Sequence, residues 1–104
     1  MIDTGAERRN YARERTHIEV EIQREFLRTK GVMEYVSFGG ALVSLSRTFP
    51  PQSVIQIRFE VPGHFGKFEG NARVVWTQKN KAIGIEFLEL PPAERLKLES
   101  LLTH

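Results

Sequence analysis

The segment FEGNARVVWTQKNKAIGIEFL, residues 68–88, holds two alternating stretches separated by a short polar turn. Apolar residues recur at every second position in both halves: Ala72, Val74 and Trp76, then Ile83, Ile85 and Phe87. A period of two is typical of strands with one buried face. The turn at Gln78–Lys81 is polar and short enough for a hairpin. The segment therefore predicts two antiparallel strands, at 68–77 and 82–88, with these six residues facing the core.

The same pattern continues toward the N-terminus and predicts four more short strands. They are expected at His17–Leu27, Val32–Ser37, Ala41–Leu45 and Val54–Val61. Glycine and proline separate the later ones, since both residues favour turns over strand interiors. The chain thus contains six short strands in close succession.

The C-terminal end has a different pattern. Pro91 and Pro92 end the last strand and can open a helix, because proline fits the first helical turn. Leucines then recur at helical spacing, at Leu98, Leu101 and Leu102. Short, closely spaced strands favour a closed barrel, since closure leaves no exposed sheet edge. We therefore expect an all-β fold: a six-stranded antiparallel β-barrel with one C-terminal α-helix. The 104 residues fit a single domain, with an arm at 1–15, the barrel at 16–90 and the helix at 91–103.

Composition argues against several classes of protein. The net charge is only +2, which does not suit a DNA- or RNA-binding surface. No apolar run approaches the ~20 residues that a membrane helix needs, so we expect no membrane insertion. Cysteine is absent and no signal peptide is visible, which suits a cytoplasmic location.

Motifs of catalysis and metal binding are also missing. The single aspartate, Asp3, lies in the expected arm. His17, His64 and His104 do not have the spacing of metal ligands. No glycine pattern of a phosphate-binding loop is present. We expect a protein that is not an enzyme, with no catalytic residue, no metal site and no cofactor.

Two segments suggest ligand binding. The arm carries four arginines within eight residues, at 8–15, and guanidinium groups match phosphate oxygens and guanine edges. The stretch at 35–40 places a serine hydroxyl before two glycines, where a ligand can approach the backbone closely. Taken alone, the first is equally explained by a solvated basic tail, and the second by a simple turn or bulge.

Together the two segments resemble the PilZ family. That family combines an Arg-x-x-x-Arg motif before the barrel with an Asp/Asn-x-Ser-x-x-Gly motif at the start of an early strand. Arg9 and Arg13 match the first motif, and Ser37 and Gly40 match the second. Tyr35 stands where the family has aspartate or asparagine.

The resemblance implies a receptor for cyclic di-GMP. By position, Arg9 and Arg13 would bind phosphate and guanine, and Ser37 and Gly40 would contact a guanine. Arg8 directly precedes the motif, and the resemblance implies that it pairs or stacks with a second nucleotide of an intercalated ligand dimer.

Tyr35 changes the chemistry of the second motif. Its phenol offers one uncharged oxygen as acceptor, and its ring could instead stack on the base. We expect the receptor to signal through a partner protein, as a monomer or weak homodimer. Two alternatives stay open: a degenerate PilZ domain that binds proteins in motility or pilus assembly without a nucleotide, and a small nucleic-acid-binding barrel, against which the low net charge argues.

Overall fold

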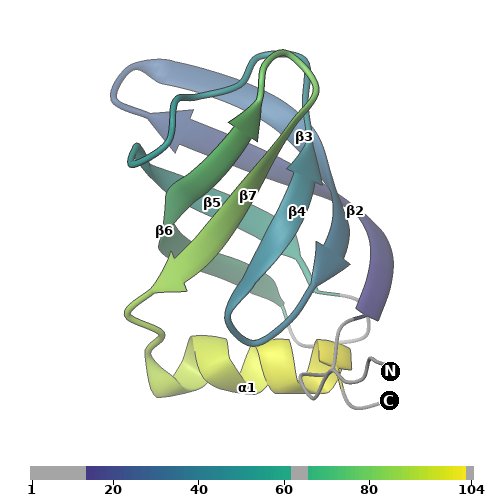
Figure 1. Ribbon diagram of the computed structural model, residues 1–104. Coiled ribbons are helices and arrows are strands. Elements are labelled where there is room, and N and C mark those ends of the chain that lie inside the picture. The colour runs from purple at the N-terminus through teal and green to yellow at the C-terminus, as the bar shows by residue number, and fades with distance from the viewer. Residues whose placement is uncertain (1–13, 62–65, 103–104) are drawn as a thin grey trace.

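The computed structural model describes residues 14–61 and 66–102, which form a closed antiparallel barrel and one helix (Figure 1). The strands close in the order β2-β3-β4-β7-β6-β5. The elements are β2 (Glu14–Arg24), β3 (Leu27–Val36), β4 (Gly40–Ser44), β5 (Val54–Glu60), β6 (Lys67–Gln78), β7 (Ala82–Leu88) and α1 (Pro92–Leu102). The predicted six-stranded barrel with a C-terminal helix is confirmed.

Alternating side chains fill the barrel. Along β5, Ile55, Ile57 and Phe59 are buried while each of their neighbours is exposed. The Phe68 ring stacks on Phe59 with a centroid separation of 4.9 Å and lies tilted against Phe87 at 5.6 Å. Full burial of a large apolar side chain contributes roughly 1.5–3 kcal/mol, so this core is the main source of stability.

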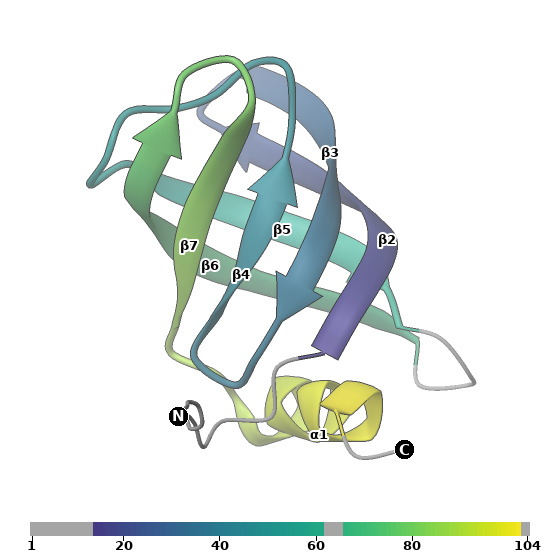
Figure 2. The same ribbon diagram turned by 45° about the vertical axis from the view of Figure 1, so that its right-hand side comes forward.

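Helix α1 covers one end of the barrel, and this end lies below the strands in Figures 1 and 2. Leu98, Leu101 and Leu102 are buried against the core. The helix has 11 residues, and no helix in the described part of the chain is long and apolar enough to cross a membrane.

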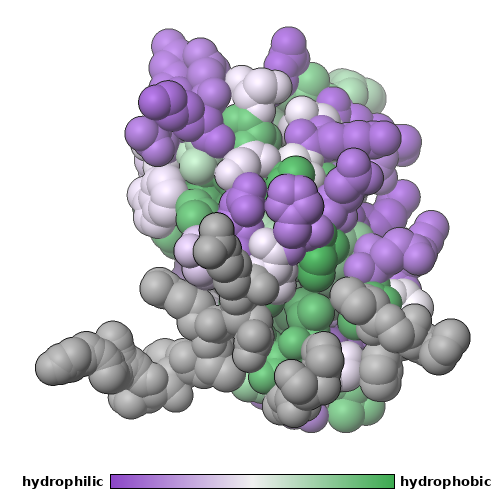
Figure 3. Space-filling model, turned by 90° about the vertical axis from the view of Figure 1, so that its right-hand side faces the viewer, coloured by the Kyte–Doolittle hydropathy of each residue, from purple (hydrophilic) through white to green (hydrophobic). Residues whose placement is uncertain are grey.

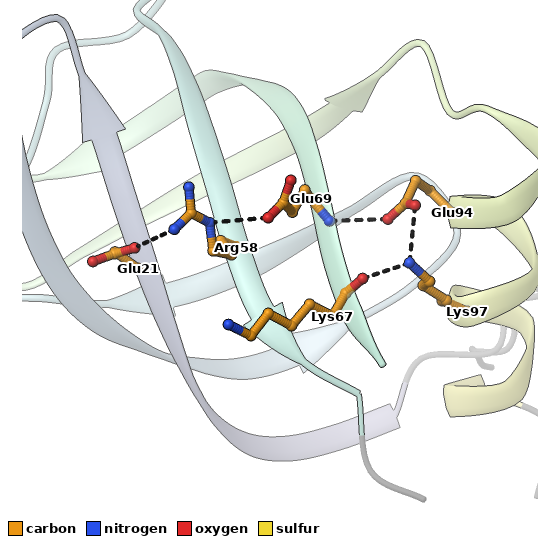
Figure 4. Close-up of polar contacts among 6 residues, drawn as sticks. All are labelled: Glu21, Arg58, Lys67, Glu69, Glu94 and Lys97. Atoms are coloured by element: carbon orange, nitrogen blue, oxygen red, sulfur yellow. Dashed lines mark hydrogen bonds and ion pairs between the residues drawn. The ribbon is translucent and has the colours of Figure 1, made fainter. Parts of the chain in front are cut away.

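A series of polar contacts fastens α1 to the barrel wall (Figure 4). Glu94 Oε1 accepts a hydrogen bond from the backbone N–H of Glu69 at 2.9 Å, and Glu94 Oε2 lies 3.0 Å from Lys97 Nζ. On the barrel, Arg58 pairs with both Glu69 and Glu21, each at 3.3 Å. The first turn of the helix is thus tied to β6, and β6 to β5 and β2.

The first predicted strand was wrong in extent. A continuous strand was expected at His17–Leu27, but β2 starts at Glu14, and the chain reverses at Glu25 and Phe26. Glu25 has a φ of 57°, in the left-handed region that is uncommon for residues other than glycine. The turn lacks the Asn-Gly or Gly-Gly sequence of most two-residue hairpins, so the sequence pattern gave no sign that the strand ends before Glu25. The turn leaves the Phe26 side chain fully exposed.

Trp76 was expected in the core but lies on the surface, with 46% of the residue exposed. A β-bulge shifts the register of β6 against β7 between Val74 and Trp76. After the buried Val74, both Val75 and Trp76 are therefore exposed. The next residue, Thr77, donates its hydroxyl to the Phe49 carbonyl at 2.6 Å. The extra residue of the bulge interrupts the alternation and turns the indole outward.

Candidate functional site

A second bulge acts on β3 in the same way. The register of β3 against β4 shifts between Met33 and Tyr35. Met33 and Val36 are buried, whereas Tyr35 is 36% exposed. Simple alternation from Met33 would have turned the Tyr35 ring into the core. Bulges of this kind re-aim side chains and are common beside functional sites.

The two bulges bring both aromatic rings to one pocket. Tyr35 from β3 and Trp76 from β6 line an open pocket of about 500 Å³ on the outer wall of the barrel. Typical ligand pockets span roughly 300–1,000 Å³, so the pocket could hold a base or part of a nucleotide. The rest of its lining comes from β3, β4, β6, β7 and the β3–β4 turn: Val36, Ser37, Gly39, Gly40, Ala41, Leu42, Val75, Gly84 and Ile85.

Gly84 makes room for the indole. It lies opposite Trp76 in the β6–β7 ladder. A Cβ atom at Gly84 would lie 2.2 Å from Trp76 Nε1 and 2.5 Å from Trp76 Cε2, which is far inside van der Waals contact. The indole can therefore rest against β7 only because position 84 has no side chain.

Ser37 and Gly40 build the turn at the edge of the pocket. The Ser37 N–H donates to the Gly40 carbonyl at 2.8 Å, and the Ser37 hydroxyl lies 3.4 Å from the same oxygen, which is a weak contact. A Cβ at Gly40 would lie 2.0 Å from the Ile85 carbonyl oxygen, because β4 passes very close to β7. Gly40 is thus required by the barrel itself, whereas the Ser37 hydroxyl has capacity left for a ligand.

The pocket offers stacking and hydrogen bonding but no charge. No charged side chain is among the described residues that line it. The predicted ligand-binding residues Arg8, Arg9 and Arg13 lie outside the described residues. Arg13 directly precedes Glu14, whose backbone pairs with Val36 in the pocket wall. The arginine-bearing segment therefore joins the barrel at the edge of this pocket.

The structure brings three of the six predicted site residues together: Tyr35, Ser37 and Gly40. Trp76 and its support, Gly84, were not predicted as site residues. For Trp76 a signal was available, because three successive apolar residues, 74–76, cannot all face one side of a regular strand. Nowhere in residues 14–61 and 66–102 do three His, Asp or Glu side chains cluster as a metal site would require.

The model of the PilZ domain family matches residues 7–104 of the chain. This match includes the arginine segment, the whole barrel and the helix. The chain has no significant sequence match among curated proteins.

Several solved structures share the fold. The PilZ domain of YcgR from Escherichia coli, solved with c-di-GMP, superposes with a TM-score of 0.72 at 17% identity, over 91% of this chain and 88% of that one. The PilZ domain of CeSA from a cellulose-synthesizing bacterium gives 0.67 at 22% identity, over 86% and 93%. The Bacillus subtilis inhibitor of motility, MotI/DgrA, gives 0.74 at 21% identity over 91% of this chain, which spans about half (49%) of that protein.

Proposed function

The chain belongs to the PilZ domain family, and from that premise we propose that it is a cyclic di-GMP receptor. In this proposal it binds the messenger in the bacterial cytoplasm, without catalysis, and passes the signal to a partner protein. One observation carries the proposal: Tyr35, Trp76 and Ser37 line a pocket at whose edge the arginine-bearing segment joins the barrel. The family relative YcgR, whose PilZ domain was solved with c-di-GMP, adds support.

A guanine base suits the aromatic walls of the pocket. Stacking of a base on an aromatic side chain contributes roughly 1–3 kcal/mol, and Tyr35 and Trp76 both present exposed ring surface. The Ser37 hydroxyl can donate to or accept from the base edge. The open backbone around Gly39, where a Cβ would meet nothing within 4 Å, lets the base approach closely.

The phosphates need positive charge that the described pocket wall does not supply. We assign this role to Arg9 and Arg13, whose planar guanidinium groups bind phosphate in two-point contacts. Arg8 is assigned to a second nucleotide of a ligand dimer. These three assignments rest on the family motif and on the place where the segment joins β2.

Calorimetric titration with cyclic di-GMP tests the proposal, with cyclic di-AMP and GTP as controls. Selective binding at micromolar affinity or tighter is expected, with a change in Trp76 fluorescence because the indole lines the pocket. Arg9→Ala and Arg13→Ala should each abolish binding, whereas Arg95→Ala, on α1, should not. Absence of heat and of any thermal stabilisation by the nucleotide would reject the receptor and favour a protein-interaction module. Retained affinity in both arginine variants would reject the arginine assignment alone.

A further inference from the structure

Three connections meet at the end of the barrel away from α1. The antiparallel strand order puts the β2–β3 turn, the loop at residues 45–53 and the β6–β7 turn at this end (Figures 1 and 2). Two of them are held together, since the Leu45 N–H donates to the Lys81 carbonyl at 2.9 Å and the Asn80 N–H donates to Thr48 Oγ1 at 3.0 Å. These two connections are therefore fixed to each other, and all three contribute to the surface at this end of the barrel.

This surface is strongly basic. Its exposed cationic residues are Arg24, Arg28, Arg47, Lys79 and Lys81. Residues 24–28, 45–53 and 78–82 contain one acidic residue against these five, a net charge of +4 that exceeds the +2 of the whole chain. Within the described residues, the ion pairs use cations on the barrel wall and helix and none of these five. We call this surface the basic end; on the face shown in Figure 3, hydrophilic residues lie at this end with hydrophobic ones between them.

A single aromatic side chain projects from the basic end. Phe26 forms the β2–β3 turn with Glu25, and its exposed fraction of 103% means that no described residue covers it. Arg24 and Arg28 lie on either side of the turn. The Phe26 ring makes no packing contact with the described part of the barrel. It could therefore insert into a deformable partner such as the headgroup layer of a membrane.

We propose that the basic end docks on a membrane surface rich in anionic lipid, with Phe26 entering the headgroup region. Positive charge spread over three turns matches a flat surface with diffuse negative charge better than a single acidic pocket. Phenylalanine is among the residues that membrane-surface segments bury at the boundary of headgroups and acyl chains, and apolar contact and charge together give stable attachment where either alone is marginal. The contact is peripheral and crosses no bilayer. It does not depend on the proposed nucleotide function, because the pocket lies on the barrel wall.

Vesicle sedimentation of the purified full chain, without nucleotide, tests the proposal. The chain should bind vesicles of equal parts phosphatidylserine and phosphatidylcholine and not vesicles of phosphatidylcholine alone. The double variant Lys79→Glu, Lys81→Glu should lower the partition coefficient about tenfold or more, since each cation near an anionic surface contributes roughly fivefold. Phe26→Ser should also lower it, without changing the net charge.

Matched variants at the opposite end serve as controls. Lys67→Glu with Arg95→Glu makes the same change in net charge, and Leu96→Ser removes an exposed apolar residue of α1. Both should keep vesicle binding. Equal loss in the controls, no effect of Phe26→Ser, or no binding to anionic vesicles would overturn the proposal. Binding to polyglutamate or to single-stranded DNA as strong as to the vesicles, and unaffected by Phe26→Ser, would overturn it in favour of an acidic protein or a nucleic acid.

Discussion

Gly84→Ala tests how the Trp76 indole is held on the barrel wall. The new Cβ would lie 2.2 Å from Nε1, and ordinary contact begins at 3.4 Å, so the indole must retreat by the difference, about 1.2 Å. The three atoms nearest to this Cβ all belong to Trp76. The severest clash of the substitution should therefore be with that one side chain.

The free energy of unfolding should show this dependence. Overpacking typically costs about 1–3 kcal/mol, and we expect about 1 kcal/mol here because the half-exposed indole can swing outward. In a Trp76→Ala background the conflict is gone. There Gly84→Ala should stabilise the protein by roughly 0.5 kcal/mol, because alanine loses less backbone entropy than glycine in a strand. The coupling between the two positions is then about 1.5 kcal/mol.

Urea denaturation of the four proteins in this cycle measures the coupling. Trp76 is the only tryptophan, so its emission reports the movement directly and should shift to longer wavelength in Gly84→Ala. An equal cost of Gly84→Ala in both backgrounds, together with unchanged emission, would refute the reasoning. The indole would then not rest on position 84.

Three further predictions concern the turn, the helix and the pocket. Gly40→Ala should destabilise the barrel by about 3 kcal/mol or more in urea denaturation, because its Cβ would clash with the backbone carbonyl of Ile85 on β7. The control Gly39→Ala should change the free energy of unfolding by less than about 0.5 kcal/mol, and similar values for both variants would contradict the close approach of β4 to β7. Glu94→Ala should lower the free energy of unfolding by about 1 kcal/mol, because the Glu69 backbone N–H of β6 loses its acceptor. Glu69→Ala removes only the exposed ion pair with Arg58 and should cost less than about 0.5 kcal/mol; the reverse order would show that α1 is not fastened through Glu94. Tyr35→Asp should tighten cyclic di-GMP binding in calorimetry, because a carboxylate accepts from the guanine N–H edge; weaker binding would identify the tyrosine ring as a contact in its own right.

The barrel was predictable because the regular alternation of apolar and polar residues determines which face of each strand is buried. On β5, β7 and most of β6, the residues expected to face inward do so, since a strand with one buried face has only two choices of register. The failures fall where a single residue breaks the period. The turn at Glu25 and Phe26 carries no turn-forming residue, and the bulge before Trp76 has no local marker other than its run of apolar residues.

The site was predictable only in part for the same reason. Ser37 and Gly40 could be placed by motif, and they do lie at the pocket edge. Trp76 could not be placed by alternation, because the bulge between Val74 and Trp76 shifts the register and leaves the indole on the surface. Its support, Gly84, comes from a strand whose pattern gives no reason to expect that role. The exposure of Trp76 and the role of Gly84 both depend on how β6 pairs with β7, and this pairing is a property of the folded barrel.

The close approach of β4 to β7 at Gly40 bears on how function is inferred across related sequences. A descendant that lost the nucleotide would still need glycine there, because the alternative is a collision with the Ile85 carbonyl. The presence of this glycine is thus evidence of the architecture and is uninformative about the messenger. The more informative position is Ser37, whose hydroxyl makes only a weak contact of 3.4 Å with the Gly40 carbonyl in the turn.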